Sequence, residues 1–400
     1  MKEQFFLSKV YQFLLVFLAF LLPLTVFGAN LIIVLIVLIW LFSGNYKLKY
    51  RKIISSKFLI ASGLFYLLHV VGLIWTSDLK WGFEMLHKMW YFILLLPVLY
   101  TIVQKKYIKY YITSFLVAIS FSELVSYLIW FEIIPPFKMA SVSNPVPFMS
   151  HVSYNPILAF AIYLVAHEMF LNKDLDKFKF FMYSFFATTM TINMFITGGR
   201  SGHVMFFAMI AILIFQFFKA EKIKSLITIS ILIPGIFFIA YQSSTLFENR
   251  VNAAINDVVT YEINSNTSVG KRIDYMVNSF DIIKKNPFIG VGTGDFPNEF
   301  LKVSIMNANR DFIRTDNPHN MYNLVVIQFG LLGLLSFLSI FYYQIKQSFQ
   351  SPSRFMRDVG ITLPLLFLLI MFGESYLLGH YTTLLYVFFS SFIYNDFKEY

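Results

Sequence analysis

The sequence predicts an all-α, polytopic membrane protein of about 12 transmembrane helices, and three observations lead to this fold class. Hydrophobic residues make up 58% of the 400 residues and charged residues only 14%. Soluble domains have roughly 45–50% apolar and about 25% charged residues, so the composition excludes an ordinary soluble enzyme, a disordered chain and a small secreted module. Long apolar stretches recur along the chain, and Lys and Arg gather between alternate stretches.

The apolar stretches give the predicted spans. A helix needs about 20 mostly apolar residues to cross a bilayer. Stretches of this kind lie at about 10–27, 30–43, 57–76, 89–103, 109–131, 153–171, 179–197, 203–218, 225–241, 320–344, 360–378 and 380–395. The first stretch has some features of a signal peptide, but a second apolar run follows at once. We therefore predict an uncleaved helical hairpin at the start of the chain.

The positions of Lys and Arg predict that both termini lie in the cytoplasm. With this orientation, 20 of the 32 basic residues fall in cytoplasmic segments and only 4 in short outer loops. The remaining 8 lie in one long outer segment, 242–319, and long translocated loops are largely exempt from the positive-inside rule. Orientation therefore accounts for the net positive charge, which does not call for a nucleic-acid partner.

The segment 242–319 is the one region with the patterning of a soluble protein. Apolar residues recur there at helical spacing in two runs: Phe247, Val251, Ile255 and Val258, then Ile273, Met276, Val277, Phe280 and Ile283. Asn286-Pro287 ends the second helix, and Pro297 starts a third that runs to about Met306. We predict three short helices over the outer membrane face, so that 1–400 forms a single integral membrane domain.

Arg200 is the first candidate functional residue. It lies between two spans, in Thr197-Gly198-Gly199-Arg200-Ser201-Gly202-His203. A charge near the bilayer centre costs at least about 2.5–3.5 kcal/mol, so such an arginine needs a partner or must reach the interface. Glycines expose backbone amides, which suits an anion. The plain alternative is a turn whose arginine reaches lipid headgroups.

Arg272 is the second candidate, at the start of the second loop helix. A guanidinium binds phosphate through two parallel hydrogen bonds, so Arg200 and Arg272 can bind a pyrophosphate together. A solvated helix face is the ordinary alternative for Arg272.

A glycine-rich turn follows in Asn286-Pro287-Phe288-Ile289-Gly290-Val291-Gly292-Thr293-Gly294. It has neither the spacing of a dinucleotide fingerprint nor the Lys-Ser/Thr of a P-loop. A hinge and a backbone nest for an anion, at Gly290 and Gly292, both remain open.

His319 is the candidate general base, where the long segment re-enters the membrane. The unperturbed pKa of histidine, about 6.5, suits proton transfer near neutrality. Asp316 can orient the ring, whereas a histidine bonded to backbone is the structural alternative. Glu123 and Glu374 lie within predicted spans, and proton coupling and a structural hydrogen bond both remain open for them. The sequence has no Cys and no HExxH pattern, which leaves thiol catalysis and a zinc protease without support.

Taken together, these elements resemble the O-antigen ligase and O-antigen polymerase superfamily. The matching elements are Gly198-Gly199-Arg200-Ser201, Arg272 with its amphipathic helix, Asn286–Gly292, and Pro318–Leu324 running into Gln328–Leu334. They occur in the family's order within about 195–340. The first five or six spans match the family only in being hydrophobic.

The resemblance implies a metal-independent, inverting glycosyltransferase of the bacterial inner membrane, with its active site and helical loop in the periplasm. Its donor would be a glycan on undecaprenyl pyrophosphate, and its acceptor lipid A-core or another lipid-linked glycan. No cofactor is implied. His319 would be the catalytic base, and Arg200 and Arg272 would bind the pyrophosphate. Supporting roles would fall to other residues nearby: Asp316, Lys271, Arg310, Arg314, Gly290 and Gly292.

Two alternatives stay open. A ligase and a polymerase differ only in the acceptor, and the long outer segment favours the ligase. A flippase or transporter for a lipid-linked sugar belongs to another class. It predicts internal two-fold repetition and interrupted midplane helices, which the sequence does not display.

Overall fold

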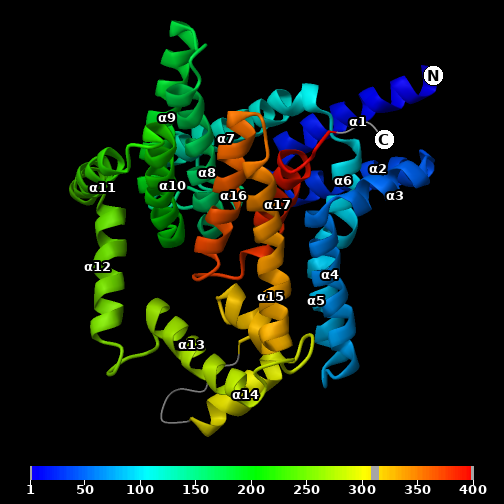
Figure 1. The fold of residues 1–400 in the computed structure, drawn as a ribbon. Helices are drawn as coiled ribbons and strands as arrows, with labels where there is room; N and C mark the ends of the chain where they lie inside the picture. The colour runs from blue at the N-terminus through cyan, green and yellow to red at the C-terminus, as the bar shows by residue number, and fades with distance from the viewer. Residues whose placement is uncertain (1, 308–314, 398–400) are drawn as a thin grey trace. The chain divides into compact units, whose positions relative to one another are not determined.

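The computed structural model describes residues 2–307 and 315–397, and no β-strand forms in these ranges. The chain divides into two compact units. The first comprises Met1–Ser8, Leu35–Lys105 and Ala253–Tyr400, and the second comprises Lys9–Val34 and Lys106–Asn252. Figure 1 labels their helices. Four elements contribute residues to both units: α1 (Lys2–Leu21), α2 (Val26–Phe42), η3 (Lys105–Tyr107) and α12 (Thr245–Val259).

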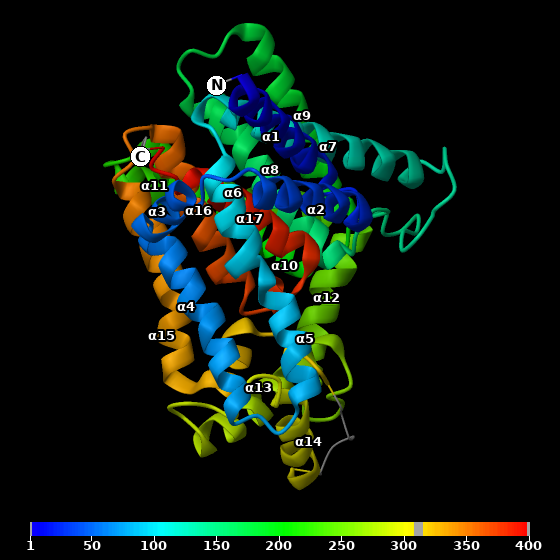
Figure 2. The ribbon, with the colours of Figure 1, turned by 90° about the vertical axis from the view of Figure 1, so that its right-hand side faces the viewer.

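The first unit is built around a short buried helix. Its helices are α3 (Tyr46–Ser55), α4 (Lys57–Val71), α5 (Leu79–Trp90), α6 (Leu96–Ile102), α13 (Ser268–Lys285), α14 (Phe296–Met306), α15 (Met321–Phe349), α16 (Arg354–Ile370) and α17 (His380–Ile393), with short turns η1 (Gly72–Ile74), η2 (Tyr91–Leu95) and η4 (Tyr376–Leu378). Every residue from Thr382 to Ile393 of α17 is buried, because α6 and α16 pack around it. The α4 helix runs beside α15 (Figure 2).

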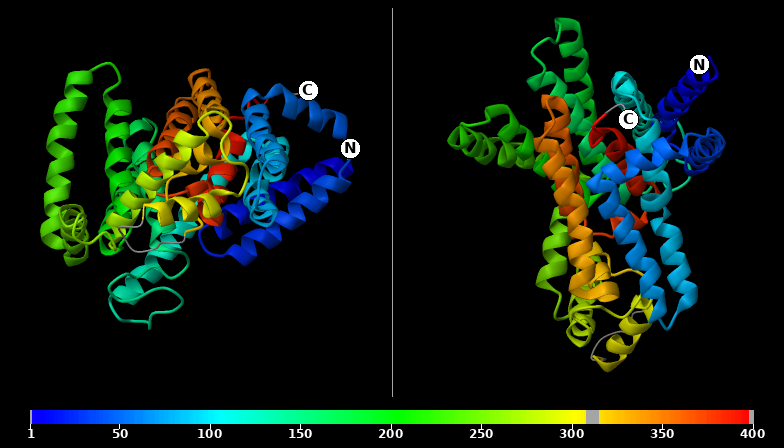
Figure 3. Two further views of the ribbon diagram at one scale, coloured as in Figure 1. Left: turned by 90° about the horizontal axis from the view of Figure 1, so that it is seen from below. Right: turned by 45° about the vertical axis from the view of Figure 1, so that its right-hand side comes forward.

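The second unit is centred on α8 (His151–Leu171), which is buried along most of its length. It packs against α9 (Lys177–Ile196) and α10 (Arg200–Phe218), while α7 (Ile108–Trp130) packs against α9. A Cβ added at Gly202 would lie 2.0 Å from the Cβ of Asn155, so this glycine lets the start of α10 approach α8 closely. Helix α11 (Lys222–Ser243) packs along α10 and buries only Ser225 and Ala240 (Figure 3).

Seven helical segments among the described residues are long and apolar enough to cross a membrane, or eight if α2 and α3, bent by 116°, form one span. The predicted count of twelve is therefore not confirmed. The stretches that fall short correspond to α1, α2, α9, α16 and α17. Of these, α16 has 17 residues and α17 only 14. Fourteen residues rise roughly 21 Å, against a hydrocarbon core of about 30 Å.

The three helices predicted in 242–319 are confirmed as α12, α13 and α14. The α13 helix ends at Lys285, directly before Asn286-Pro287, as the sequence indicates. At its start, the side chain of Thr267 accepts a hydrogen bond from the Gly270 N–H. Pro297 occupies the first turn of α14, where its missing N–H costs nothing.

Candidate functional site

His319 lies in the turn that leads into α15, and its backbone conformation is unusual. Its φ is 50°, in the left-handed region that non-glycine residues rarely adopt. The Asn317 side chain accepts a hydrogen bond from the His319 N–H at 3.0 Å. Immediately after His319, Asn320 caps α15 by accepting from the Asn323 N–H at 3.1 Å. Such backbone strain persists only where surrounding contacts hold it, and it gathers at functional sites.

A carboxylate holds the imidazole. The Nδ1 atom of His319 lies 2.6 Å from Oε2 of Glu374. Asn317 Nδ2 donates to the other carboxylate oxygen at 2.8 Å, and the Ser375 N–H donates to that same oxygen at 2.9 Å. The Ser375 hydroxyl in turn donates to Asn317 Oδ1 at 2.7 Å. Glu374 and Asn317 therefore fix both the ring and the backbone of His319.

The hydrogen bonds at Glu374 favour its ionised form. Burial alone would raise the pKa of this carboxyl, but the bonds from His319, Ser375 and Asn317 outweigh burial and lower it. A carboxylate at Nδ1 accepts the Nδ1 proton, so the lone pair of a neutral imidazole lies on Nε2. The His319 side chain is 37% exposed, so Nε2 can meet a substrate. This is the relation of base and orienting carboxylate found in catalytic triads.

The face of the imidazole rests on the long loop. The rings of Tyr275 and His319 are stacked, with centroids 5.6 Å apart and planes 14° apart. Tyr275 lies on α13, and its ring also forms an edge-to-face pair with Phe300 of α14. Since α13 also packs against α15 (Figure 1), the helices of the loop determine which side of His319 remains open.

Two cationic side chains lie one turn from this stack. Arg272 and Lys271 precede Tyr275 by three and four residues on α13, and residues at these spacings share a helix face. Both are half-buried. Neither forms a hydrogen bond or ion pair with a described residue, so both charges are available to an anionic substrate group that lies along this face of α13.

The glycine-rich turn is a packing element. Its amides donate to protein oxygens: those of Val291 and Gly292 to the carbonyls of Ile327 and Gln328, at 2.8 and 3.0 Å, and that of Gly294 to the Gln328 side chain. The Gly290 amide likewise donates to a carbonyl within the turn. These amides are therefore not open to an anion, which argues against the nest that the sequence left open beside a hinge.

A buried carboxylate that sequence reasoning missed secures the same turn. Asp295 is 4% exposed and accepts hydrogen bonds from the hydroxyls of Thr76 and Ser77 and from the amides of Ser77 and Asp78. Asp78 in turn caps α5 by accepting from the Trp81 N–H. The hydrogen bonds of Asp295 join the α4–α5 connection to the start of α14. The same helix carries Phe300, the ring that packs against Tyr275.

Arg200 lies in the second unit, as the first residue of α10. The turn before it is held by side chains from elsewhere in the unit. Asn144 accepts from the Gly198 N–H at 2.9 Å, and Asn155 donates to the carbonyl of Thr197 at 3.4 Å. The His203 ring nitrogen lies 3.0 Å from that same carbonyl. The glycine turn and its arginine thus have a defined backbone.

The structure does not support the predicted places of two acidic residues, Asp316 and Glu374. Asp316 is exposed and makes no hydrogen bond to a described residue, so the carboxylate that orients His319 is Glu374 instead. Glu374 is not within a span, because α16 ends at Ile370 and a turn follows. Arg310 and Arg314 lie outside the described residues. Within the described residues, no group of three His, Asp or Glu is arranged to hold a metal ion.

Comparison with known proteins agrees with the motifs. Residues 185–338 match the family described as O-antigen ligase, whose members are glycosyltransferase-like enzymes that use lipid-linked glycans. A protein of Haemophilus influenzae, described as uncharacterized, is 26% identical over 207 residues, or 49% of this chain. The match spans 51% of that relative's length. As the resemblance in the sequence predicted, residues 185–338 match the O-antigen ligase family.

Proposed function

We propose that this protein is an O-antigen ligase-like glycosyltransferase that moves a glycan from undecaprenyl pyrophosphate to lipid A-core at the periplasmic face of the inner membrane. One observation carries the proposal. His319 lies within the family-matched region, is bonded to Glu374 through Nδ1 and has a partly exposed ring. That ring stacks on Tyr275, which lies one helical turn after Arg272 on α13. This is a base poised next to a site for an anionic leaving group.

In the proposed reaction, Nε2 of His319 takes the proton from an acceptor sugar hydroxyl. The hydroxyl oxygen then attacks the anomeric carbon of the donor from the side opposite the phosphate. The bond between that carbon and the phosphate oxygen breaks, and its electron pair leaves with the pyrophosphate. One displacement inverts the anomeric centre. Glu374 stabilises the imidazolium that forms, because it remains an ionised hydrogen-bond acceptor at Nδ1.

Charge then accumulates on the departing pyrophosphate. We propose that Arg272 binds these oxygens, with Lys271 next to it on α13. Arg200 is proposed for the same task on the resemblance of its turn to the family. Fixed cations at the place where negative charge develops stabilise the transition state with little reorganisation. Pyrophosphate is a good leaving group, so the scheme includes neither a general acid nor a metal ion.

A transfer assay on the purified full chain in detergent tests this function. The reaction contains an undecaprenyl-pyrophosphate glycan from the source organism, lipid A-core and EDTA. We expect the glycan to appear on lipid A-core, and we expect His319→Ala and Arg272→Ala to abolish the transfer. Asp316→Asn is the matched control, because it changes an exposed acidic residue three positions from His319.

Other products would assign another activity. A ladder of longer carrier-linked glycans would identify a polymerase. If neither product formed while the protein moved the lipid-linked glycan across vesicle membranes, the transferase proposal would be wrong and a flippase would replace it. Activity that EDTA abolishes and that a divalent cation restores would contradict the metal-independent scheme.

A further inference from the structure

A second arginine lies against the turn that precedes Arg200. Arg250 is on α12, and its guanidinium covers Gly198. A Cβ added to that glycine would lie 3.0 Å from Nη2 and 3.3 Å from Nε of Arg250. Gly198 does not have a positive φ, so the close approach of the guanidinium, rather than backbone conformation, calls for glycine here. Both residues belong to the second unit.

The guanidinium of Arg250 has no counter-charge in the part of the chain that the structure describes. None of its nitrogens forms a hydrogen bond or ion pair with a described residue, and Nε is buried as well. An arginine carries five N–H donors in a planar fork. Buried donors nearly always have an acceptor, so the unpaired Nε–H of Arg250 indicates that a ligand supplies one.

The neighbours of Arg250 are also donors. Asn144 uses its Oδ1 to accept the Gly198 N–H, so its Nδ2 donates to His151 Nδ1, 3.0 Å away. A neutral imidazole that accepts at Nδ1 carries its proton on Nε2, where it is a donor. His151 is near enough to Arg250 for the positive charge to act on its ring. A cation with hydrogen-bond donors around it is an environment that favours an anion.

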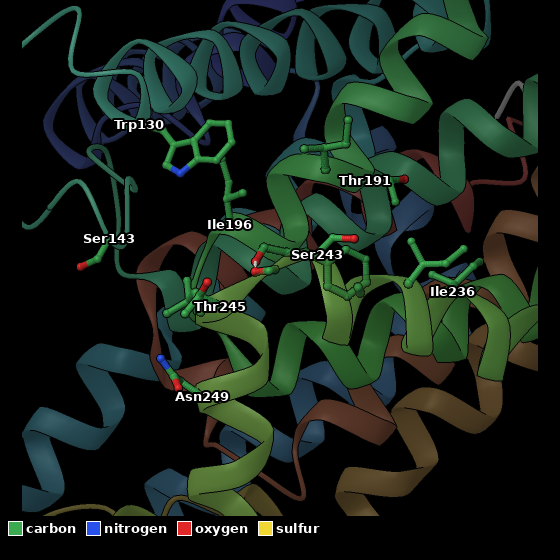
Figure 4. Close-up of a pocket in the computed structure, with 14 residues that line it drawn as sticks. Trp130, Ser143, Thr191, Ile196, Ile236, Ser243, Thr245 and Asn249 are labelled. Atoms are coloured by element: carbon green, nitrogen blue, oxygen red, sulfur yellow. Dashed lines mark hydrogen bonds between the residues drawn. The ribbon is translucent and has the colours of Figure 1, made fainter.

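An apolar pocket of about 620 Å³ is lined by residues of α9, α11 and the start of α12 (Figure 4). Its walls come mainly from apolar side chains of α9 and α11, among them Phe195, Ile196, Ile236 and Ile239. The volume is within the range of roughly 300–1,000 Å³ that is usual for small-molecule sites. Because α11 is exposed along most of its length, a lipid chain can reach the pocket from the bilayer.

Chain neighbours link the pocket to Arg250 and to Asn144 and Gly198 beside it. Three residues that line the pocket stand beside these residues in the chain: Ser143 precedes Asn144, Ile196 is two residues before Gly198, and Asn249 precedes Arg250. Leu246 also lines the pocket, one helical turn before Arg250 on the same face of α12. The site therefore has a cationic end and an apolar end, as a lipid phosphate requires.

We propose that Arg250 and this pocket bind the polyprenyl pyrophosphate carrier of the donor. The phosphate lies on the guanidinium of Arg250, whose planar fork matches two phosphate oxygens, and the first isoprene units fill the pocket. The inference rests on the proposed function. It deepens that function by assigning the lipid carrier to a site in the second unit.

A binding titration tests the assignment. The full chain is placed in phosphatidylcholine nanodiscs and titrated with undecaprenyl pyrophosphate that carries no glycan, and the dissociation constant is read from the shift in the thermal unfolding midpoint. Arg250→Gln removes the cation, Arg250→Lys keeps the charge but loses the fork, and Ile236→Trp fills the pocket. Arg51→Gln is the control, because Arg51 is an exposed arginine on α3.

We expect Arg250→Gln to raise the dissociation constant by at least about tenfold, Arg250→Lys to raise it by less, and Arg51→Gln to leave it unchanged. Arg250→Gln should also reduce the preference for undecaprenyl pyrophosphate over undecaprenyl monophosphate. Ile236→Trp should weaken both lipids equally, because it acts on the chain and not on the phosphates. A general loss of folding would not produce this difference.

Three results would overturn the inference. The first is a dissociation constant for Arg250→Gln within about twofold of the wild-type value. The second is equal competition by phosphatidylglycerol, which would make this an ordinary phospholipid site. The third is transfer that His319→Ala abolishes while Arg250→Gln keeps the wild-type KM for the donor, and this would leave the proposed function intact. If the wild-type chain neither bound the carrier nor transferred glycan, both proposals would fail.

Discussion

The orientation of a single imidazole depends on residues that are distant in the chain. Glu374 is 55 residues after His319, yet its carboxylate accepts at Nδ1, and Asn317 joins the two by bonding both the carboxylate and the His319 amide. The positive φ of His319 is maintained by these contacts. One carboxylate therefore determines the tautomer of the base as well as the local backbone.

Glu374→Gln should affect the orientation of the His319 proton without affecting the binding of the donor. The glutamine amide can present either a donor or an acceptor to Nδ1, so the proton is no longer held on that nitrogen and Nε2 is less often a base. We expect kcat to fall by about 10²-fold, with the KM for donor within about threefold of the wild-type value. Steady-state transfer kinetics measure both constants. An equal loss of kcat in Asp316→Asn would show that negative charge near the turn matters, rather than the hydrogen bond to His319 Nδ1.

The same carboxylate predicts a pH dependence of stability. The pKa of Glu374 is lowered from its usual 4.5 in the folded protein, so the ionised group stabilises the fold above that pH. The stabilisation should be lost as the pH falls from about 4.5 through the lower folded-state pKa. Thermal unfolding midpoints in detergent from about pH 3 to about pH 7, a range that includes the usual glutamate pKa of about 4.3, check this. Glu374→Gln should flatten the acid limb of the curve, and an unchanged acid limb would contradict the prediction.

At the scale of secondary-structure elements, the glycine-rich turn shows how an apparent ligand motif serves packing. Gly290 has a φ of 68°, and an added Cβ would lie 2.3 Å from the backbone of Gln328. Gly330, at the kink of α15, has a φ of 60° and approaches the backbone of Phe288 equally closely. The backbones of the two segments thus lie in direct contact. This contact fixes the position of α15, the helix that begins two residues after His319.

Gly290→Ala should therefore be strongly destabilising. The substitution places a methyl group into a main chain that cannot move away and forces a positive φ on alanine. We expect a loss of about 3 kcal/mol or more in the free energy of unfolding, measured by denaturant titration in detergent. Gly235→Ala on α11 is the matched control, because an added Cβ meets nothing within 4 Å there. That variant should stay within about 1 kcal/mol of the wild type. Similar losses in the two variants would mean that the close approach at Gly290 is unimportant.

Sequence patterns predicted these elements unevenly. The helices α12, α13 and α14 follow directly from helical spacing and from Asn286-Pro287 and Pro297, because local patterns specify them. His319 was identified from its motif, but its partner Glu374 was not, because apolar neighbours placed that residue inside a span. Tyr275 was passed over as well, since an aromatic residue at helical spacing usually belongs to a core. Long-range contacts of this kind leave no periodic trace in the sequence.

At the scale of the whole molecule, hydropathy identified every apolar segment but not how each one is used. Seven predicted spans coincide with helices that are long enough to cross a bilayer. The apolar stretch 360–378 is broken after Ile370, and α17 is a short helix buried within the first unit. A buried helix and a lipid-exposed one have equally apolar sequences, so composition alone counts both as spans.

The orientation of the chain remains a prediction, and the absence of cysteine from all 400 residues makes it directly testable, because any introduced thiol is unique. The basic-residue asymmetry places 242–319 outside and the connection between α8 and α9 inside. In spheroplasts, a membrane-impermeant maleimide should label Asn266→Cys and should label Asp174→Cys only after lysis. Both positions are exposed, so the difference reports on sidedness rather than burial. The reverse pattern would place His319 on the cytoplasmic side, where the proposed transfer to a periplasmic acceptor cannot take place.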